Sequence, residues 1–275
     1  MEFAVCNEIF ESADRREAYR FASELGYRGL EIAPFTLGPD PTALTAQQRD
    51  DFAREVEDAG LQVVGLHWLL AKTEGYHLTT TDQSVRRKTA DYFLRLIDLC
   101  ADLGGGVMVL GSPAQRNFGS PMTHDEAAKN AMDTIHRFTE HLSARSVALA
   151  LEPLGPTEGN FLNRAADAVE IVESMSHPFV RLHLDVKAMS SEGEDVGEII
   201  RRNANHLIHF HANDPNLLGP GMGEFDQRPV FAALREINYR GWVSVEVFQF
   251  ELGYRKILTD SWRGMQDAIR AASGE

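Results

Sequence analysis

Eight short apolar runs recur along this 275-residue chain, each separated from the next by a loop and an amphipathic stretch. Each run is too short for a buried helix and is rich in Val, Ile or Leu, as is typical of a strand covered on both faces. We therefore predict strands at Phe3–Cys6, Gly29–Ala33, Leu61–Trp68, Gly106–Gly111, Ser146–Pro153, Val180–Val186, His206–Ala212 and Trp242–Phe248.

The segments between these runs have helical periodicity and recognisable ends. Gly26 and Gly60 each follow such a segment and suit the left-handed residue that ends a helix. Thr123 and Glu126 have the spacing of a capping box, which predicts a helix start. We predict helices at Asp14–Leu25, Ala46–Ala59, Thr123 to about Ala144, and Asn163–Met175.

An alternation of strand and helix that repeats eight times implies parallel strands joined by right-handed crossovers. The chain length is close to the roughly 250 residues typical of an eight-stranded β/α barrel. A doubly wound open sheet is the alternative, but it would show fewer units and a glycine-rich first turn, which residues 5–8 lack. We predict the α/β class and a single (β/α)8 TIM barrel, with one domain at residues 1–275.

The composition disfavours several kinds of partner. There are 41 acidic and 27 basic side chains, and the resulting net charge of -14 repels nucleic acid and anionic membranes. No stretch approaches the roughly 18 uncharged apolar residues of a membrane span. Two cysteines suit a reducing compartment, and the first residues lack the basic segment of a signal peptide. We expect a cytoplasmic protein with neither partner and leave assembly into a homo-oligomer open.

Ligand-type residues end the last four predicted strands. They are Glu152, Asp185, His211 and Glu246, separated by 33, 26 and 35 residues, each about one strand–helix unit. Catalytic groups of a β/α barrel lie at this end of its strands, so we expect all four to meet at one rim.

Three converging carboxylates would repel one another unless a cation lay between them. Three oxygens and one imidazole favour one divalent ion, Mn²⁺, Mg²⁺ or Co²⁺, with Zn²⁺ as a further alternative. The simpler interpretation, that these are salt-bridged residues at strand ends, suits any one of them better than all four together.

Several segments resemble the xylose isomerase-like barrel superfamily of sugar isomerases and epimerases, especially its ketose 3-epimerase and hydroxypyruvate isomerase branches. They are Leu151–Asn163, His183–Ser190, His209–Asp226 and Gly241–Phe248. The resemblance implies that Glu152, Asp185, His211 and Glu246 are metal ligands. It also implies that Glu152 and Glu246 transfer protons and that Glu158 contacts the substrate.

This resemblance implies an isomerase or epimerase of a small keto sugar. The metal would chelate the carbonyl and a neighbouring hydroxyl of the sugar. One glutamate would remove the intervening proton to give a cis-enediolate, and the other would return a proton. A metal-dependent lyase of the inosose or dehydroshikimate dehydratase kind is the alternative, in which the enediolate expels a β-substituent.

Polar groups that the epimerase branch uses to hold its substrate are missing here. Ala188 stands where a histidine is usual, Leu217 where an arginine is usual, and Gly155-Pro156 where Asn-Arg is usual. Lys187 is a candidate replacement for the histidine, or else a solvated loop lysine. These departures keep the lyase alternative open. An endonuclease of the same superfamily is disfavoured by the net charge and by missing histidines, and a non-catalytic sugar-binding barrel by the intact ligand set.

His67 and Trp68 end the third strand and are candidates for the floor and wall of a sugar pocket, or for a buried core pair. Glu31 ends the second strand in a similar position.

Other residues have weaker functional signals. His183 and His209 each precede a ligand by two residues, so they either orient that ligand or are hydrogen-bonded core histidines. The stretch Gly219–Gly223 suits a mobile lid. Arg116 follows the fourth strand and is expected to be solvated, with an anionic substrate as the alternative partner.

Overall fold

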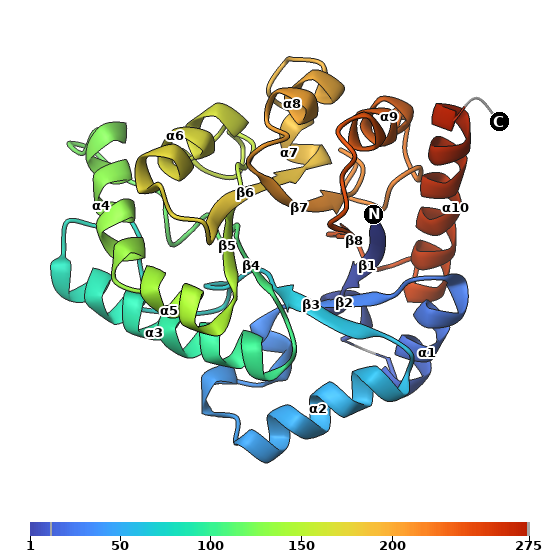
Figure 1. The fold of residues 1–275 in the computed structure, drawn as a ribbon, viewed down its shortest axis with the longest axis horizontal. Helices are drawn as coiled ribbons and strands as arrows, with labels where there is room; N and C mark the ends of the chain where they lie inside the picture. The colour runs from blue at the N-terminus through green and yellow to red at the C-terminus, as the bar shows by residue number, and fades with distance from the viewer. Residues whose placement is uncertain (12, 274–275) are drawn as a thin grey trace.

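The computed structural model describes residues 1–11 and 13–273 and contains a closed barrel of eight parallel strands in the order β1 to β8. The (β/α)8 prediction is therefore confirmed (Figure 1). Residues 12, 274 and 275 of the predicted domain lie outside the described residues. The strands are β1 (Glu2–Cys6), β2 (Gly29–Ile32), β3 (Gln62–Leu66), β4 (Val107–Leu110), β5 (Ala148–Leu151), β6 (Val180–Asp185), β7 (Leu207–Ala212) and β8 (Trp242–Val245).

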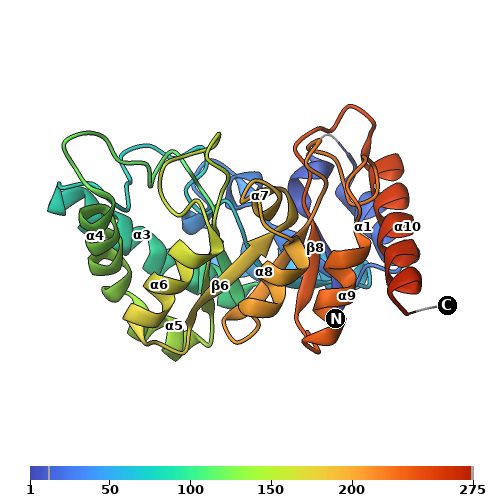
Figure 2. The ribbon, with the colours of Figure 1, turned by 90° about the horizontal axis from the view of Figure 1, so that it is seen from above.

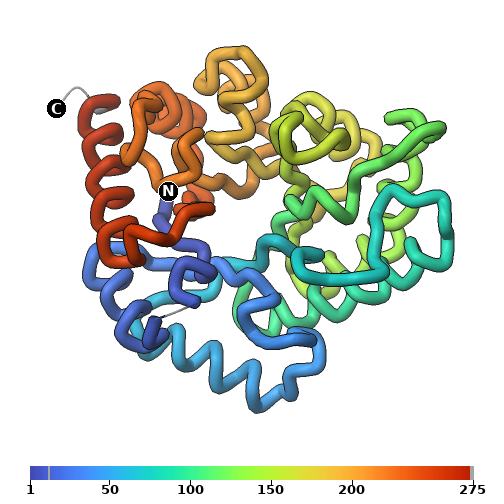
Figure 3. Tube along the Cα trace, turned by 180° about the vertical axis from the view of Figure 1, so that it is seen from behind, coloured from blue at the N-terminus to red at the C-terminus, as the bar shows by residue number. Residues whose placement is uncertain are grey.

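Helices surround the barrel, and the first and last of them lie side by side where β1 pairs with β8 (Figures 1 and 3). The α-helices are α1 (Arg15–Leu25), α2 (Ala46–Asp58), α3 (Gln83–Asp102), α4 (His124–His136), α5 (Thr139–Arg145), α6 (Ala165–Met175), α7 (Val186–Ser190), α8 (Val196–Arg202), α9 (Arg228–Glu236) and α10 (Tyr254–Ser273). Three short 3₁₀ helices complete the described chain, η1 (Asn7–Phe10), η2 (Pro34–Leu37) and η3 (Pro41–Ala43).

One predicted helix is two helices in the structure. The capping box at Thr123 and Glu126 is present, but α4 ends at His136 and α5 begins only at Thr139. Between them the buried ring of Phe138 stacks on Phe93 with centroids 4.8 Å apart. The interruption places Phe138 in the core, so packing overrides the continuous helical periodicity of this segment.

The barrel interior is apolar at one end and polar at the other. Because successive strand residues face opposite sides, Ala150 and Glu152 point the same way, as do His209 and His211. Ala150 belongs to a small buried cluster that is separate from the main core between strands and helices. The apolar cluster consists of Ala4, Val64, Val107, Val109 and Ala150. The carboxyl ends of the strands therefore hold the polar side chains.

Long loops gather along the upper edge in Figure 2, whereas the N-terminus lies at the lower edge. Loops that follow barrel strands carry the functional groups of this fold. Among residues 1–11 and 13–273, no helix combines the length and the apolar character needed to cross a lipid bilayer.

Candidate active site

The four side chains predicted at the strand ends converge in the barrel mouth. Glu152, Asp185, His211 and Glu246 are all buried, with at most 3% exposure, and one ligand atom of each lies within 4.8 Å of those of the others. Nδ1 of His211 is 3.2 Å from Oε2 of Glu246 and 4.0 Å from Oε1 of Glu152. The four residues thus form one compact set of oxygen and nitrogen atoms.

Backbone hydrogen bonds to the neighbouring strand hold both glutamates in place. The Glu152 N–H donates to Leu110 O at the end of β4, and the Glu246 N–H donates to Ala212 O at the end of β7. The carboxylate of Asp185 accepts the Ala188 N–H at 2.7 Å and so caps the short helix α7. Each ligand-type side chain therefore projects from a rigid element.

The three buried carboxylates repel one another, and this repulsion shifts their pKa values. Burial, and then the charge of Glu246, raise the pKa of Glu152 to about 8 and that of Asp185 to about 6. Burial alone would raise the pKa of Glu246 as well, but the adjacent His211 outweighs it and lowers that pKa. Carboxyl groups held in this state bind a cation readily, because the cation removes their mutual repulsion.

The donor set fits a divalent cation. Nδ1 of His211 is buried without any hydrogen-bond partner and lies 3.2 Å from Oε2 of Glu246, so both atoms are available as ligands. Three carboxylates and one imidazole suit Mn²⁺, Mg²⁺, Co²⁺ or Zn²⁺.

Glu31 orients His211, the histidine of this set. Its carboxylate lies 2.7 Å from Nε2 of His209 and 3.1 Å from Nε2 of His211. A proton on Nε2 of His211 leaves the Nδ1 lone pair directed at the carboxylates, as metal ligation requires. His183, by contrast, has no hydrogen bond at either ring nitrogen although it is fully buried, so it is not a hydrogen-bonded core histidine.

A cavity of about 360 Å³ opens over the set. Of the four ligand-type residues, the two that line it are Glu152 and Glu246. Trp68 and Glu158, both candidates for substrate contact, also line it, whereas His67 is fully buried. His67 therefore faces other protein groups rather than a pocket wall.

Lys187 and Glu158 form an ion pair of 2.7 Å beside this cavity. Nζ of Lys187 also lies 4.3 Å from the ring centroid of Phe248, and Phe248 stacks on Trp68 with centroids 5.9 Å apart. Burial would lower the pKa of Lys187, but Asp185 and Glu158 outweigh it and raise that pKa. The lysine is a cation held at the site and not a solvated loop residue.

Arg116 differs from its sequence-based expectation. It is 1% exposed, and its Nη1 donates to Glu152 O at 2.7 Å and to Leu110 O at 3.1 Å. Burial lowers its pKa to about 10. The expectation of a solvated arginine is wrong, because the loop after β4 folds this side chain back over the end of β5.

Sequence reasoning missed Glu8. It lies in η1 directly after β1, is 4% exposed, and has Oε2 at 3.0 Å from Nε2 of His67. The rule that identified the four ligands, an acidic residue at a strand end, applies to β1 as well and would have found it.

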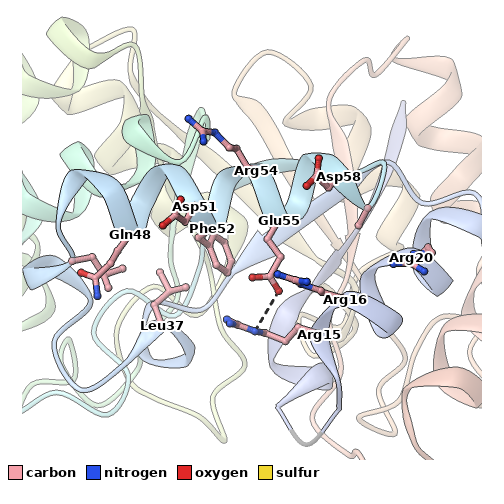
Figure 4. A pocket seen from close by; sticks show the side chains of 12 residues that line it. Arg15, Arg16, Arg20, Leu37, Gln48, Asp51, Phe52, Arg54, Glu55 and Asp58 are labelled. Atoms are coloured by element: carbon pink, nitrogen blue, oxygen red, sulfur yellow. Dashed lines mark ion pairs between the residues drawn. The ribbon is translucent and has the colours of Figure 1, made fainter.

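A second, larger cavity of about 640 Å³ lies outside the barrel along α1 and α2 (Figure 4). Its wall mixes arginines with acidic residues, among which Arg15 and Glu55 pair at 3.7 Å. It holds none of the converging carboxylates and is separate from the candidate active site.

Comparison with known proteins places this geometry in context. Residues 19–271 match the family described as xylose isomerase-like TIM barrel. A probable ketose 3-epimerase of Synechocystis is 28% identical over 86% of this chain and 79% of its own length. A 3-dehydro-D-guloside 4-epimerase of Escherichia coli is 25% identical over 90% of this chain and 92% of its own length.

Solved structures share the fold. A D-psicose 3-epimerase crystallised in the presence of D-fructose superimposes with a TM-score of 0.84 at 20% identity, covering 100% of both chains. A 3-keto-D-glucoside 4-epimerase of Escherichia coli superimposes with a TM-score of 0.83 at 21% identity, covering 97% of this chain and 99% of the other.

Proposed function

Because the chain belongs to the xylose isomerase-like TIM barrel family, we propose that it is a divalent-metal-dependent epimerase or isomerase of a small keto sugar. The observation that carries this proposal is the placement of two glutamates from one ligand set in the wall of one cavity. Glu152 and Glu246 both line the cavity above the convergent ligand atoms. Two carboxylates facing one substrate provide a base and an acid.

Glu152, Asp185, His211 and Glu246 would hold the ion. When bound, a divalent ion would polarise the substrate carbonyl and stabilise charge that develops on its oxygen. Asp185 and His211 do not line the cavity, and we assign them as ligands only. Their role leaves proton transfer to the two glutamates.

One glutamate removes the proton of the hydroxyl-bearing carbon next to the carbonyl, and the electron pair of that C–H bond forms the double bond of a cis-enediolate. The other glutamate, which comes from a strand on the opposite side of the set, returns a proton. Return to the same carbon epimerises the sugar, and return to the neighbouring carbon isomerises it. Burial excludes water from both carboxylates and so favours transfer between substrate and protein.

Lys187 and Glu158 position the sugar in this proposal. Their ion pair stands beside the cavity and offers a cation and an acceptor to sugar hydroxyls. Trp68 and Phe248 supply an apolar wall suited to the faces of a sugar ring.

A lyase is the second candidate, favoured by one observation. Leu217 is 37% exposed and Ala188 carries no polar side chain, so neither supplies the contact that the epimerase branch makes at these positions. A substrate held differently at its distal end would allow the enediolate to expel a β-hydroxyl or β-alkoxyl group.

Proton NMR in D₂O tests both candidates. Metal-loaded protein is incubated with a panel of ketoses, keto-polyols and 3-keto glycosides, and a chelator-stripped sample serves as the control. We expect deuterium at the carbon next to the carbonyl only with metal. A new epimer or isomer supports the main proposal, and loss of water or alcohol supports the lyase. No exchange with any substrate of the panel would contradict both.

A further inference from the structure

A second group of ligating side chains lies next to the proposed metal site and shares one residue with it. Glu8, His67 and Glu246 come from the ends of β1, β3 and β8, and one ligand atom of each lies within 4.8 Å of the others. All three are buried, with exposures of 4%, 0% and 1%. The group is therefore enclosed by protein, with Glu246 as the member that also lines the cavity.

Two carboxylate oxygens in this group have no partner. Oε1 of Glu8 and Oε1 of Glu246 are buried without a hydrogen bond, whereas Oε2 of Glu8 is 3.0 Å from Nε2 of His67. A buried carboxylate oxygen without a partner is unfavourable unless a cation lies beside it. Both oxygens therefore point to a cation that the single proposed ion does not provide.

The balance of charge leads to the same conclusion. Five buried carboxylates meet in this part of the barrel, those of Glu8, Glu31, Glu152, Asp185 and Glu246. One divalent ion, the guanidinium of Arg116 and an imidazolium at His67 leave one negative charge in excess. A second divalent ion in place of the His67 proton would balance the five carboxylates.

Of the two ring nitrogens of His67, Nε2 is better placed to bind a cation. On the Nδ1 side, the carboxylate of Glu31 already lies 2.7 Å from His209 and 3.1 Å from His211. Nδ1 itself is unpaired and 3.9 Å from Oε1 of Glu31, whereas Nε2 donates to Oε2 of Glu8 at 3.0 Å. A cation on Nε2 would displace that proton to Nδ1, on the side of Glu31, and a carboxylate on that side is what orients a metal-binding histidine.

The spacing on the Nε2 side suits metal ligands. Neighbouring ligands about 2.1 Å from an octahedral ion lie about 3 Å apart, close to the 3.0 Å between Glu8 and His67. A ligand set of two carboxylates and one imidazole suits Mn²⁺, Co²⁺ and Zn²⁺ alike.

We propose that Glu8, His67 and Glu246 bind a second divalent cation, with Glu246 shared between the two ions, and that this second ion inhibits the enzyme. Inhibition follows because Oε2 of Glu246 faces His211 and the first site, which leaves Oε1 as the oxygen that receives a proton. An ion on Oε1 would occupy that oxygen. The inhibitory half rests on the proposed function, whereas binding of the second ion does not.

Manganese binding to the chelator-stripped full chain tests the site without substrate. We expect about two Mn²⁺ per chain at saturation, as in other two-metal sites, and an exchange-coupled electron paramagnetic resonance spectrum. Glu8→Gln should retain about one ion and lose the coupling. Glu11→Gln, an exposed glutamate at the end of the same turn, should behave as the unchanged protein does.

His67→Asn provides a second variant if Glu8→Gln does not fold, and a thermal melt checks each. About one Mn²⁺ per chain in the unchanged protein, with an uncoupled spectrum, would overturn the proposal and would leave the His67 imidazolium as the counter-ion of Glu8.

Turnover tests the inhibitory half. Activity should rise with the first equivalent of Mn²⁺ and fall as the second binds, and Glu8→Gln should lose the fall but keep the rise. Undiminished inhibition in that variant would contradict the assignment. If no substrate is turned over, the proposed function fails while stoichiometry and spectrum still decide the second site.

Discussion

The carboxylate of Glu152 lies directly against Gly111, the residue that follows β4. A Cβ atom at Gly111 would stand 1.6 Å from Oε2 of Glu152, which is a steric clash. Gly111 therefore makes room for the carboxylate, and its missing side chain is a structural requirement of the proposed metal site.

Gly111→Ala should displace Glu152 and weaken metal binding. We expect affinity for Mn²⁺ to fall by roughly 10–100-fold, the range for losing support of a ligand. Isothermal titration of stripped protein measures it. Gly106→Ala, at the other end of β4 with nothing within 4 Å of its Cβ position, should bind as the unchanged protein does. Equal affinity in both variants would show that Glu152 does not need this space.

Glu246→Gln and Glu152→Gln should each lower turnover by roughly 10²–10⁴-fold, because each keeps one ligand oxygen but loses the basic one. Metal affinity should fall only moderately. The variant that still exchanges the substrate proton with D₂O identifies the residue that acts first. Glu251→Gln, an exposed residue of the loop after β8, is the control. Near-native turnover in either folded, metal-loaded variant would exclude the two-glutamate mechanism.

Asp185→Asn should separate metal binding from folding. Asparagine keeps an oxygen that accepts the Ala188 N–H and so retains the cap of α7. In the unchanged protein Mn²⁺ should raise the melting temperature, because it binds the folded state. In the variant this rise should shrink. The metal-free melting temperature should fall only modestly, because the α7 cap remains while the bond that Oδ2 of Asp185 accepts from Asn213 Nδ2 is lost. A rise of unchanged size would remove Asp185 from the metal site.

The metal-free protein should lose stability between about pH 6.5 and 8.5. The raised pKa of Glu152, about 8, means that the folded state holds a proton that the unfolded state loses above about pH 4.5. His67 and His211 also have raised pKa values, because neighbouring thiol and carboxyl groups outweigh burial. Their contribution is complete below about pH 6.5 and is lost as the pH rises.

The opposing groups do not reverse this slope. Within the candidate site, Glu31 and Glu246 have lowered pKa values, and their contributions are already complete above about pH 5, as are those of the other carboxyls with lowered pKa values. His183, whose pKa burial and neighbouring histidines lower, changes stability only below about pH 6.5. Melting temperatures of chelator-treated protein at pH 6.5, 7.5 and 8.5 check the expectation. A constant or rising series would contradict it, and the Mn²⁺-loaded protein should show a smaller decline.

Lys187→Met should raise KM by roughly 10-fold or more with a smaller effect on kcat, because the variant loses a charge-assisted contact to the substrate. Lys187→Arg should recover part of the loss. Lys256→Met, on the exposed face of α10, is the matched control. If KM for the Lys187 variant equals that of the control, the ion pair with Glu158 is structural only.

The strand–helix alternation and the ligand-type residues at the last four strand ends could be recognised from the sequence. Both are local patterns, since period and strand endings are properties of neighbouring residues. Parallel strands in a closed barrel then require Glu152, Asp185, His211 and Glu246 to reach the same rim.

Which other side chains lie against that rim was decided by the tertiary structure alone. Glu8 meets His67 across 59 residues and Arg116 folds over the end of β5, because closure of the barrel sets their depth and direction. The break between α4 and α5 has the same origin, since Phe138 packs on a helix distant in sequence. How deep a side chain lies, and which side chains of other strands it contacts, depend on the closure of the barrel between β1 and β8. No local pattern in the chain encodes these contacts between distant residues.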